Sequence, residues 1–116
     1  AGNDFGSGVR EAKDFMPACI EATNFYTIGS MDLNYQTGSI GFSAFSNFGS
    51  PTIDWVVPGN YIFSTYPNNK YAVMQGTSMS TALMAGLLHL TNGSLNTQAQ
   101  VNGIHGESYT YPVPKK

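Results

Sequence analysis

Gly76-Thr77-Ser78-Met79 opens the most apolar stretch of the chain, which continues to Leu90 as MSTALMAGLLHL. The stretch is long enough for a helix, and Gly93 follows it as a stop signal. Its residues are apolar on nearly every face, and such a helix belongs in the interior of a fold. We therefore expect one buried helix here, with Ser78 in its first turn.

Short strands are expected before this helix, where β-branched and aromatic residues gather between turn signals. They are predicted at residues 20–31, 42–48 (a short strand or a compact loop), 53–57, 61–65 and 71–74. Residues 1–16 and 34–41 have the composition of loops, and residues 96–116 are predicted as a polar surface tail. Strands followed by a tight turn and a buried helix favour the α/β class. One helix cannot cover both faces of such a sheet, so we expect the chain to be part of a larger domain.

The composition excludes several classes of protein. The 116 residues are 41% hydrophobic and 10% charged, and the formal net charge of -2 gives no basic surface for nucleic acid. No apolar run reaches the roughly 18 residues of a membrane span. Cys19 is the only cysteine, so no disulfide can close within the chain. The chain begins at Ala1 without an initiator methionine or signal peptide, and we expect it to begin inside a longer protein.

Ser78 allows two kinds of role. A serine in the first turn of a helix is commonly a cap or plain helix filler. It can also be a nucleophile, because free backbone N–H groups and the positive end of the helix dipole face an incoming oxyanion. The Gly-x-Ser-x-Gly elbow of the α/β-hydrolases does not fit, since Ser80 stands at its second glycine. Position alone leaves both roles open.

Several blocks of the sequence resemble motifs of the subtilisin-like serine proteases, in the same order and with roughly the same spacing. Gly76-Thr77-Ser78-Met79 resembles their serine motif, Gly-Thr-Ser-Met-Ala-x-Pro, and Ala1-Gly2-Asn3 resembles their Ala-Gly-Asn oxyanion motif. The blocks between them are residues 17–18, 27–32, 45–49, 54–59 and 62–65. The resemblance covers about residues 1–95, as the C-terminal part of a catalytic domain with residues 96–116 as its tail. Ala82 and Leu83 depart from the motif, which usually has proline and then histidine there.

The resemblance implies a mostly parallel, subtilisin-like sheet with a buried helix that carries the serine. It also implies acyl transfer, in which Ser78 Oγ attacks a peptide carbonyl. The Asn3 side chain and the Ser78 backbone N–H would receive the oxyanion, with support from Thr77. The residues implied to line the substrate pocket are Ala1, Gly2 and Asp4.

The catalytic residues named so far do not include the general base that acyl transfer needs. In the family, the triad aspartate and histidine precede the oxyanion motif, and those blocks are absent here. His89 lies on the same helix roughly 16 Å beyond Ser78, at about 1.5 Å per residue. His105 could reach Ser78 only if the tail folded back. We therefore expect the partner to be an N-terminal fragment of the same protease that carries the aspartate and histidine, with a peptide or protein as substrate. The alternative is a non-catalytic binding or structural protein derived from the same fold.

Three further expectations come from the resemblance and from a short motif. Asp54 is either an ordinary strand carboxylate or, as in some relatives, a ligand of a structural Ca²⁺ together with carbonyls near Thr23 and Phe25. No cofactor is expected for catalysis. The family resemblance implies a secreted or extracellular protein. Asn92-Gly-Ser is a glycosylation sequon, which matters only in a eukaryotic secretory route.

Overall fold

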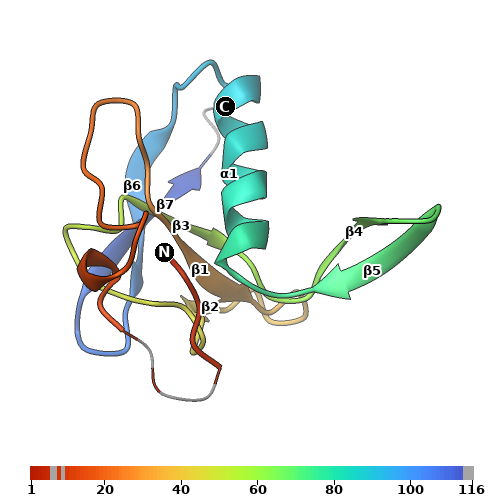
Figure 1. The fold of residues 1–116 in the computed structure, drawn as a ribbon, viewed down its shortest axis with the longest axis horizontal. Helices are drawn as coiled ribbons and strands as arrows, with labels where there is room; N and C mark the ends of the chain where they lie inside the picture. Colours follow the sequence, from red (N-terminus) through yellow and green to blue (C-terminus); the bar gives the residue numbers. More distant parts are fainter. Residues whose placement is uncertain (6–7, 9, 114–116) are drawn as a thin grey trace.

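One long helix packs against a small mixed sheet in the computed structural model, which describes residues 1–5, 8 and 10–113 (Figure 1). The elements in chain order are η1 (Ala12–Asp14), β1 (Ile28–Leu33), β2 (Ile40–Phe42), β3 (Trp55–Pro58), β4 (Ile62–Tyr66), β5 (Lys70–Met74), α1 (Thr77–Leu90), β6 (Asn96–Asn102) and β7 (Ser108–Val113). Residues 6, 7 and 9 of the predicted N-terminal loop and 114–116 of the predicted tail lie outside the described residues.

The central strand of the main sheet is β1, and the strand order is β2-β1-β3. β1 runs parallel to β3, with Ile28 opposite Trp55, and antiparallel to β2. The predicted α/β class is confirmed, although β1–β3 is the one parallel pair among the described strands. The strand predicted from residue 20 begins only at Ile28. The reason is a turn, in which the Phe25 N–H donates to the Ala22 carbonyl at 3.1 Å and Asn24 takes a φ of 61°.

The helix α1 is confirmed, and it packs on β1 and β3 along one face. Met84 is buried there against Ile28 and Val57. Leu83 and Leu90 remain 43% and 83% exposed. Apolar residues on an uncovered helix face agree with the expectation of a larger domain. None of the helices in the described part of the chain is long and apolar enough to cross a membrane.

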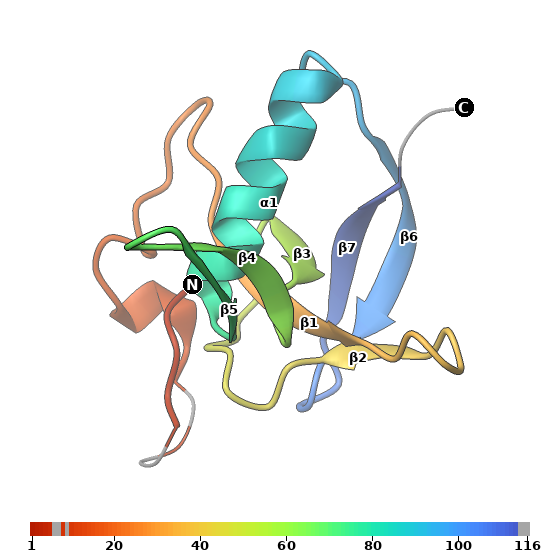
Figure 2. The same cartoon turned by 90° about the vertical axis from the view of Figure 1, so that its right-hand side faces the viewer.

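The β4–β5 hairpin projects away from the rest of the structure in Figure 1, and it points toward the viewer in Figure 2. Its turn places Asn68 and Asn69 at positive φ, a conformation that asparagine tolerates better than most residues. Phe63 and Tyr71 stack on its surface with ring centroids 5.3 Å apart. The hairpin matters for the site because β5 leads within three residues into α1.

The prediction of a surface tail after residue 95 is wrong for the residues that the structure describes. Residues 96–113 form the antiparallel hairpin β6–β7, which packs beside β2 and β3. Val101 and Tyr109 belong to the larger hydrophobic core, and Tyr109 stacks on Phe42 at 4.7 Å. The Tyr109 hydroxyl accepts a hydrogen bond from the Gly49 N–H at 2.8 Å, and burial raises the pKa of that hydroxyl. The hairpin is therefore an integral part of the fold.

Candidate active site

The N-terminal segment lies against the first turn of α1, although the two are far apart in sequence (Figure 1). The Ala1 nitrogen donates to the Ile28 carbonyl at 2.8 Å, which ties the segment to the start of β1. Burial lowers the pKa of that amino group to about 6. The Gly2 N–H donates to Thr77 Oγ1 at 3.1 Å. These bonds place residue 3 directly beside the helix start.

The Asn3 side chain has a fixed orientation. The Thr77 backbone N–H donates to Asn3 Oδ1 at 2.8 Å, across 74 residues of sequence. Because a backbone N–H can only donate, the amide oxygen must face Thr77, and the Nδ2 group is left for another acceptor. Nδ2 lies 3.0 Å from the point where a Cβ on Gly76 would stand. Gly76, with a φ of 146°, therefore gives this amide the space it occupies.

Ser78 is exposed in the same turn, whereas its neighbour Thr77 is buried. The backbone N–H groups of the first helical turn have no intrahelical acceptors. The Thr77 N–H is taken by Asn3, while those of Met79 and Ser80 reach the Gly76 carbonyl. The remaining N–H, that of Ser78, points from a helix N-terminus, where a negative charge is stabilised. The turn thus combines a hydroxyl with two N–H donors, from Asn3 and from Ser78 itself.

Asn47 holds the loop that carries Asn3, a role that sequence reasoning missed. It is 1% exposed, and its Nδ2 donates to the Ala1 carbonyl at 3.2 Å. Its backbone N–H donates to the Gly2 carbonyl at 2.9 Å, and its Oδ1 accepts from the Arg10 N–H. The only sequence signal was its place within the resemblance block 45–49. These hydrogen bonds fix the loop of Asn3, and a fixed position is what a hydrogen-bond donor in electrostatic catalysis requires.

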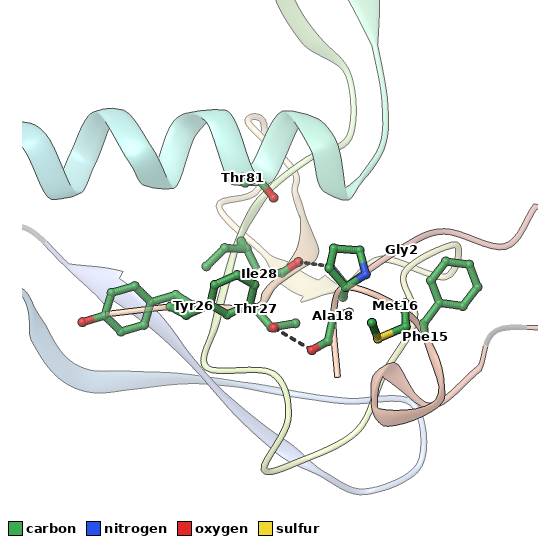
Figure 3. Close-up of a pocket in the computed structure, with 11 residues that line it drawn as sticks. Gly2, Phe15, Met16, Ala18, Tyr26, Thr27, Ile28 and Thr81 are labelled. Carbon is green, nitrogen blue, oxygen red and sulfur yellow. Dashed lines mark hydrogen bonds between the residues drawn. The ribbon is translucent and has the colours of Figure 1, made fainter. Parts of the chain in front are cut away.

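Two hollows flank this turn. One, of about 350 Å³, is lined by Ala1 and Gly2. Thr81 of α1 and the segment around Phe15 form other parts of its wall (Figure 3). The other, of about 270 Å³, contains Ser78. Its lining is mainly apolar and comprises Ile62, Ser64, Thr65, Ala72, Met74, Ser78, Met79, Ala82 and Leu83. Asp4 lines neither hollow; its backbone N–H donates to the Phe45 carbonyl at 2.8 Å.

Neither histidine of the chain approaches Ser78. His89 is exposed in the last turn of α1, roughly 16 Å along the helix axis. His105 lies in the turn between β6 and β7, where its ring packs at a tilt against the Phe48 ring with centroids 4.4 Å apart. The described side chains therefore place no imidazole base at the candidate nucleophile.

Cys19 is half-buried and lies far from Ser78 in sequence. Its Sγ is 3.1 Å from Met16 Sδ.

The predicted calcium ligands are only partly brought together. Asp54 and Phe25 line one hollow of about 200 Å³, together with Glu21, but Thr23 is not part of its lining. One oxygen of Asp54 accepts a hydrogen bond from the Thr27 N–H at 2.7 Å. Among the residues that the structure describes, no three His, Cys, Asp or Glu side chains gather at one point. Any ion there would need main-chain carbonyls as ligands.

The sequence matches one known protein family and several of its members. Residues 1–103 match the model of the Subtilase family, Peptidase_S8. Thermitase from Thermoactinomyces vulgaris is 48% identical over 68 residues, which are 59% of this chain and 22% of thermitase. The intracellular serine protease of Paenibacillus polymyxa is 40% identical over 84 residues, 69% of this chain and 26% of that protein. The chain thus spans about a quarter of the length of these two relatives.

A solved structure agrees with the sequence matches. A cold-adapted subtilisin-like serine proteinase superposes with a TM-score of 0.69 and is 28% identical. The match covers 96% of this chain and 42% of that chain. It includes nearly all of the described fold, so the sheet, the helix and the C-terminal hairpin have counterparts in one known architecture.

Proposed function

Because the chain belongs to the subtilase family, we propose that it carries the nucleophile and the oxyanion donors of a serine endopeptidase. The observation that supports this most directly is the hydrogen bond from the Thr77 N–H to Asn3 Oδ1 at 2.8 Å. It turns the Nδ2 group of Asn3 away from Thr77 and toward the space beside Gly76, in the turn that exposes Ser78. A capping asparagine would also accept from a backbone N–H of the first turn, so the support comes from the position of Nδ2 beside Gly76 and the exposed Ser78.

In the proposed reaction, Ser78 Oγ attacks the carbonyl carbon of the scissile peptide and loses its proton to a histidine. The carbonyl oxygen becomes an oxyanion, which accepts hydrogen bonds from Asn3 Nδ2 and the Ser78 N–H. The histidine returns the proton to the leaving amine as the C–N bond breaks, and water then hydrolyses the acyl-enzyme. Thr77 contributes by holding Asn3. Ala1 and Gly2 contribute to substrate binding at the neighbouring hollow, with Asp4 next to them in sequence.

The histidine and its orienting aspartate are proposed to come from an N-terminal fragment of the same protease. The position of both local histidines supports this, since one is at the far end of α1 and the other is on the β6–β7 turn. The apolar hollow around Ser78 also supports it. Met74, 44% exposed, and Leu83, 43% exposed, line that hollow and would be covered by the partner fragment.

Covalent labelling tests the assignment of the nucleophile. A fluorophosphonate added to the complete protease should attach to Ser78, and mass spectrometry should place the adduct on the peptide that contains Gly76 to Met79. Activation by a neighbouring base makes this serine reactive. Ser43, Ser46 and Ser80 are completely buried, so they should stay unlabelled. An adduct on any of those three would mean that Ser78 is not the nucleophile. No adduct at all would favour the alternative, a non-catalytic binding or structural protein.

The isolated chain should neither melt cooperatively nor hydrolyse peptides. It exposes apolar residues on the outer face of α1 and on the β4–β5 hairpin, and it has no base near Ser78. Circular dichroism during heating and a peptidase assay on the chain alone check this. Addition of the N-terminal fragment should restore both properties. A cooperative transition together with hydrolysis by the chain alone would contradict the need for a partner.

Two further properties are part of the proposal. A structural Ca²⁺ near Asp54 is supported by the two carboxylates, of Asp54 and Glu21, that line one hollow together with Phe25, since Ca²⁺ prefers oxygen ligands. The ion would neutralise the carboxylates there and take no part in the chemistry. A secreted location is proposed from the family, although one relative is named an intracellular serine protease.

A further inference from the structure

Asn3 pairs through its backbone with the segment 45–48. The two form an antiparallel bridge between Asn3 and Ser46. Backbone hydrogen bonds of 2.8 and 2.9 Å lie on either side of the bridge. Ser46 is fully buried, and its Oγ accepts a hydrogen bond from the Ser30 N–H of β1 at 3.1 Å. Segment 45–48 thus connects the backbone at Asn3 to the main sheet.

The side chain of Asn47 joins this segment to two further points of the chain. Its Nδ2 donates to the Ala1 carbonyl at 3.2 Å, and its Oδ1 accepts from the Arg10 N–H at 3.1 Å. A carbonyl can only accept and a backbone N–H can only donate, so both partners require the same orientation of the amide. Ala1 precedes Asn3 in the chain and Arg10 follows it. One buried amide therefore ties together the chain on both sides of Asn3.

Asn47 also touches the backbone of Gly2, which lies between Ala1 and Asn3. A Cβ on Gly2 would stand 2.8 Å from Asn47 Nδ2, so a side chain there would displace the Asn47 amide. Gly2 has a φ of 92°, which glycine adopts readily and other residues rarely. The Gly2 N–H in turn donates to Thr77 Oγ1 at 3.1 Å. Asn47, Gly2 and the first turn of α1 are thus in contact one after another.

We propose that Asn47 is a positioning residue for the oxyanion step: its side-chain amide ties Ala1 to Arg10 and so keeps Asn3 Nδ2 where the negative charge develops. The inference rests on the proposed function, since it assigns Asn47 a role that acts through Asn3. Asn47 lines neither of the two hollows that flank the turn of Ser78, so it is not a catalytic residue itself. A displacement of about 1 Å in such a site can lower the rate by about 10²-fold.

The test measures kcat of Asn47→Ala in two backgrounds of the complete protease, wild type and Asn3→Leu. In the wild-type background kcat should fall about tenfold, because the loop of Asn3 loses two hydrogen bonds and the donor shifts. In the Asn3→Leu background there is no donor to displace, so the same substitution should change kcat by less than about twofold. KM does not decide the question, since Ala1 and Gly2 also line the proposed substrate hollow.

A second variant and a control accompany this comparison. Asn47→Ser is the milder change and should show the same dependence on Asn3. Asn102→Ala removes an exposed asparagine side chain in β6 and should leave kcat unchanged. For every variant, kcat is divided by the fraction of molecules that a fluorophosphonate labels at completion, so unfolded protein does not lower the value.

A merely structural role gives a different pattern. It would lower the melting temperature but leave kcat within about twofold in the wild-type background, and this result would overturn the proposal. An equal fall in both backgrounds would also overturn it, since Asn47 would then act independently of Asn3. Labelling separates the two levels of inference. If the wild-type protein is labelled at Ser78, an unchanged kcat for Asn47→Ala refutes only the role of Asn47; a wild-type protein that is neither labelled nor active refutes the proposed function as well.

Discussion

Ser78→Ala is expected to lower kcat of the complete protease by about 10⁶-fold, the largest effect of any single substitution in this chain. This magnitude is borrowed from subtilisin, a member of the same family. The substitution removes the atom that forms the acyl-enzyme, and no other described serine is placed to replace it. Ser80, the nearest along the helix, is completely buried. Substrate should still bind, because Asn3 and all the other residues that line the two hollows are unchanged.

The measurement is kcat and KM on one peptide substrate, with the melting temperature as a control for folding. Ser78 is exposed, and its side chain has no hydrogen bond to any residue that the structure describes, so the melting temperature should change little. Ser108→Ala, at an exposed position in β7, should behave as wild type. Activity that stays above about one hundredth of the wild-type value would show that the acyl-enzyme does not form on Ser78.

Much of the local structure could be predicted from the sequence because local patterns dominate there. The apolar run after Gly76 predicts α1, and its observed start at Thr77 lies within one residue of that glycine. The hairpin β4–β5 follows two short apolar segments with a Pro-Asn-Asn turn between them. The C-terminal hairpin was missed because its strands are mostly polar. Only residues such as Val101 and Tyr109 reach the core, and their burial depends on Phe42 and Gly49, which are distant in sequence.

In the candidate site, too, the residues could be predicted from the sequence, but the contacts between distant segments could not. The resemblance predicted that Asn3 and Ser78 act together, and the structure brings Asn3 to the turn of Ser78 through the Thr77 N–H. Residue type alone could not give the orientation of the Asn3 amide, because that depends on a bond across 74 residues. Nor could it reveal that Asn47 holds the loop of Asn3, because the bonds of Asn47 to Ala1 and Gly2 join segments that are distant in sequence.

Asn3→Leu should slow the chemical step while leaving substrate binding nearly intact. Its Nδ2 group is held beside the helix start, where the negative charge develops on the carbonyl oxygen only in the transition state. Loss of one such donor lowers kcat by about 10²–10³-fold, or roughly 3–4 kcal/mol, a size again taken from subtilisin. Leucine branches at Cγ as asparagine does and has nearly the same shape, but it cannot donate a hydrogen bond. Thr77 would lose its acceptor as well, so a modest fall in melting temperature is expected.

The assay must therefore separate lost chemistry from lost structure. We expect kcat of the Asn3→Leu protein to fall by the stated factor, with KM within about threefold, when both proteins are measured well below their melting temperatures. Asn3→Asp is the matched variant, because an aspartate oxygen can still accept from the Thr77 N–H but cannot donate to an oxyanion. It should restore much of the lost stability and none of the rate. If Asn3→Leu keeps kcat within threefold of wild type, about 0.65 kcal/mol, Asn3 has no part in the transition state. Recovery of rate by Asn3→Asp would lead to the same conclusion, since only the contact with Thr77 would then matter.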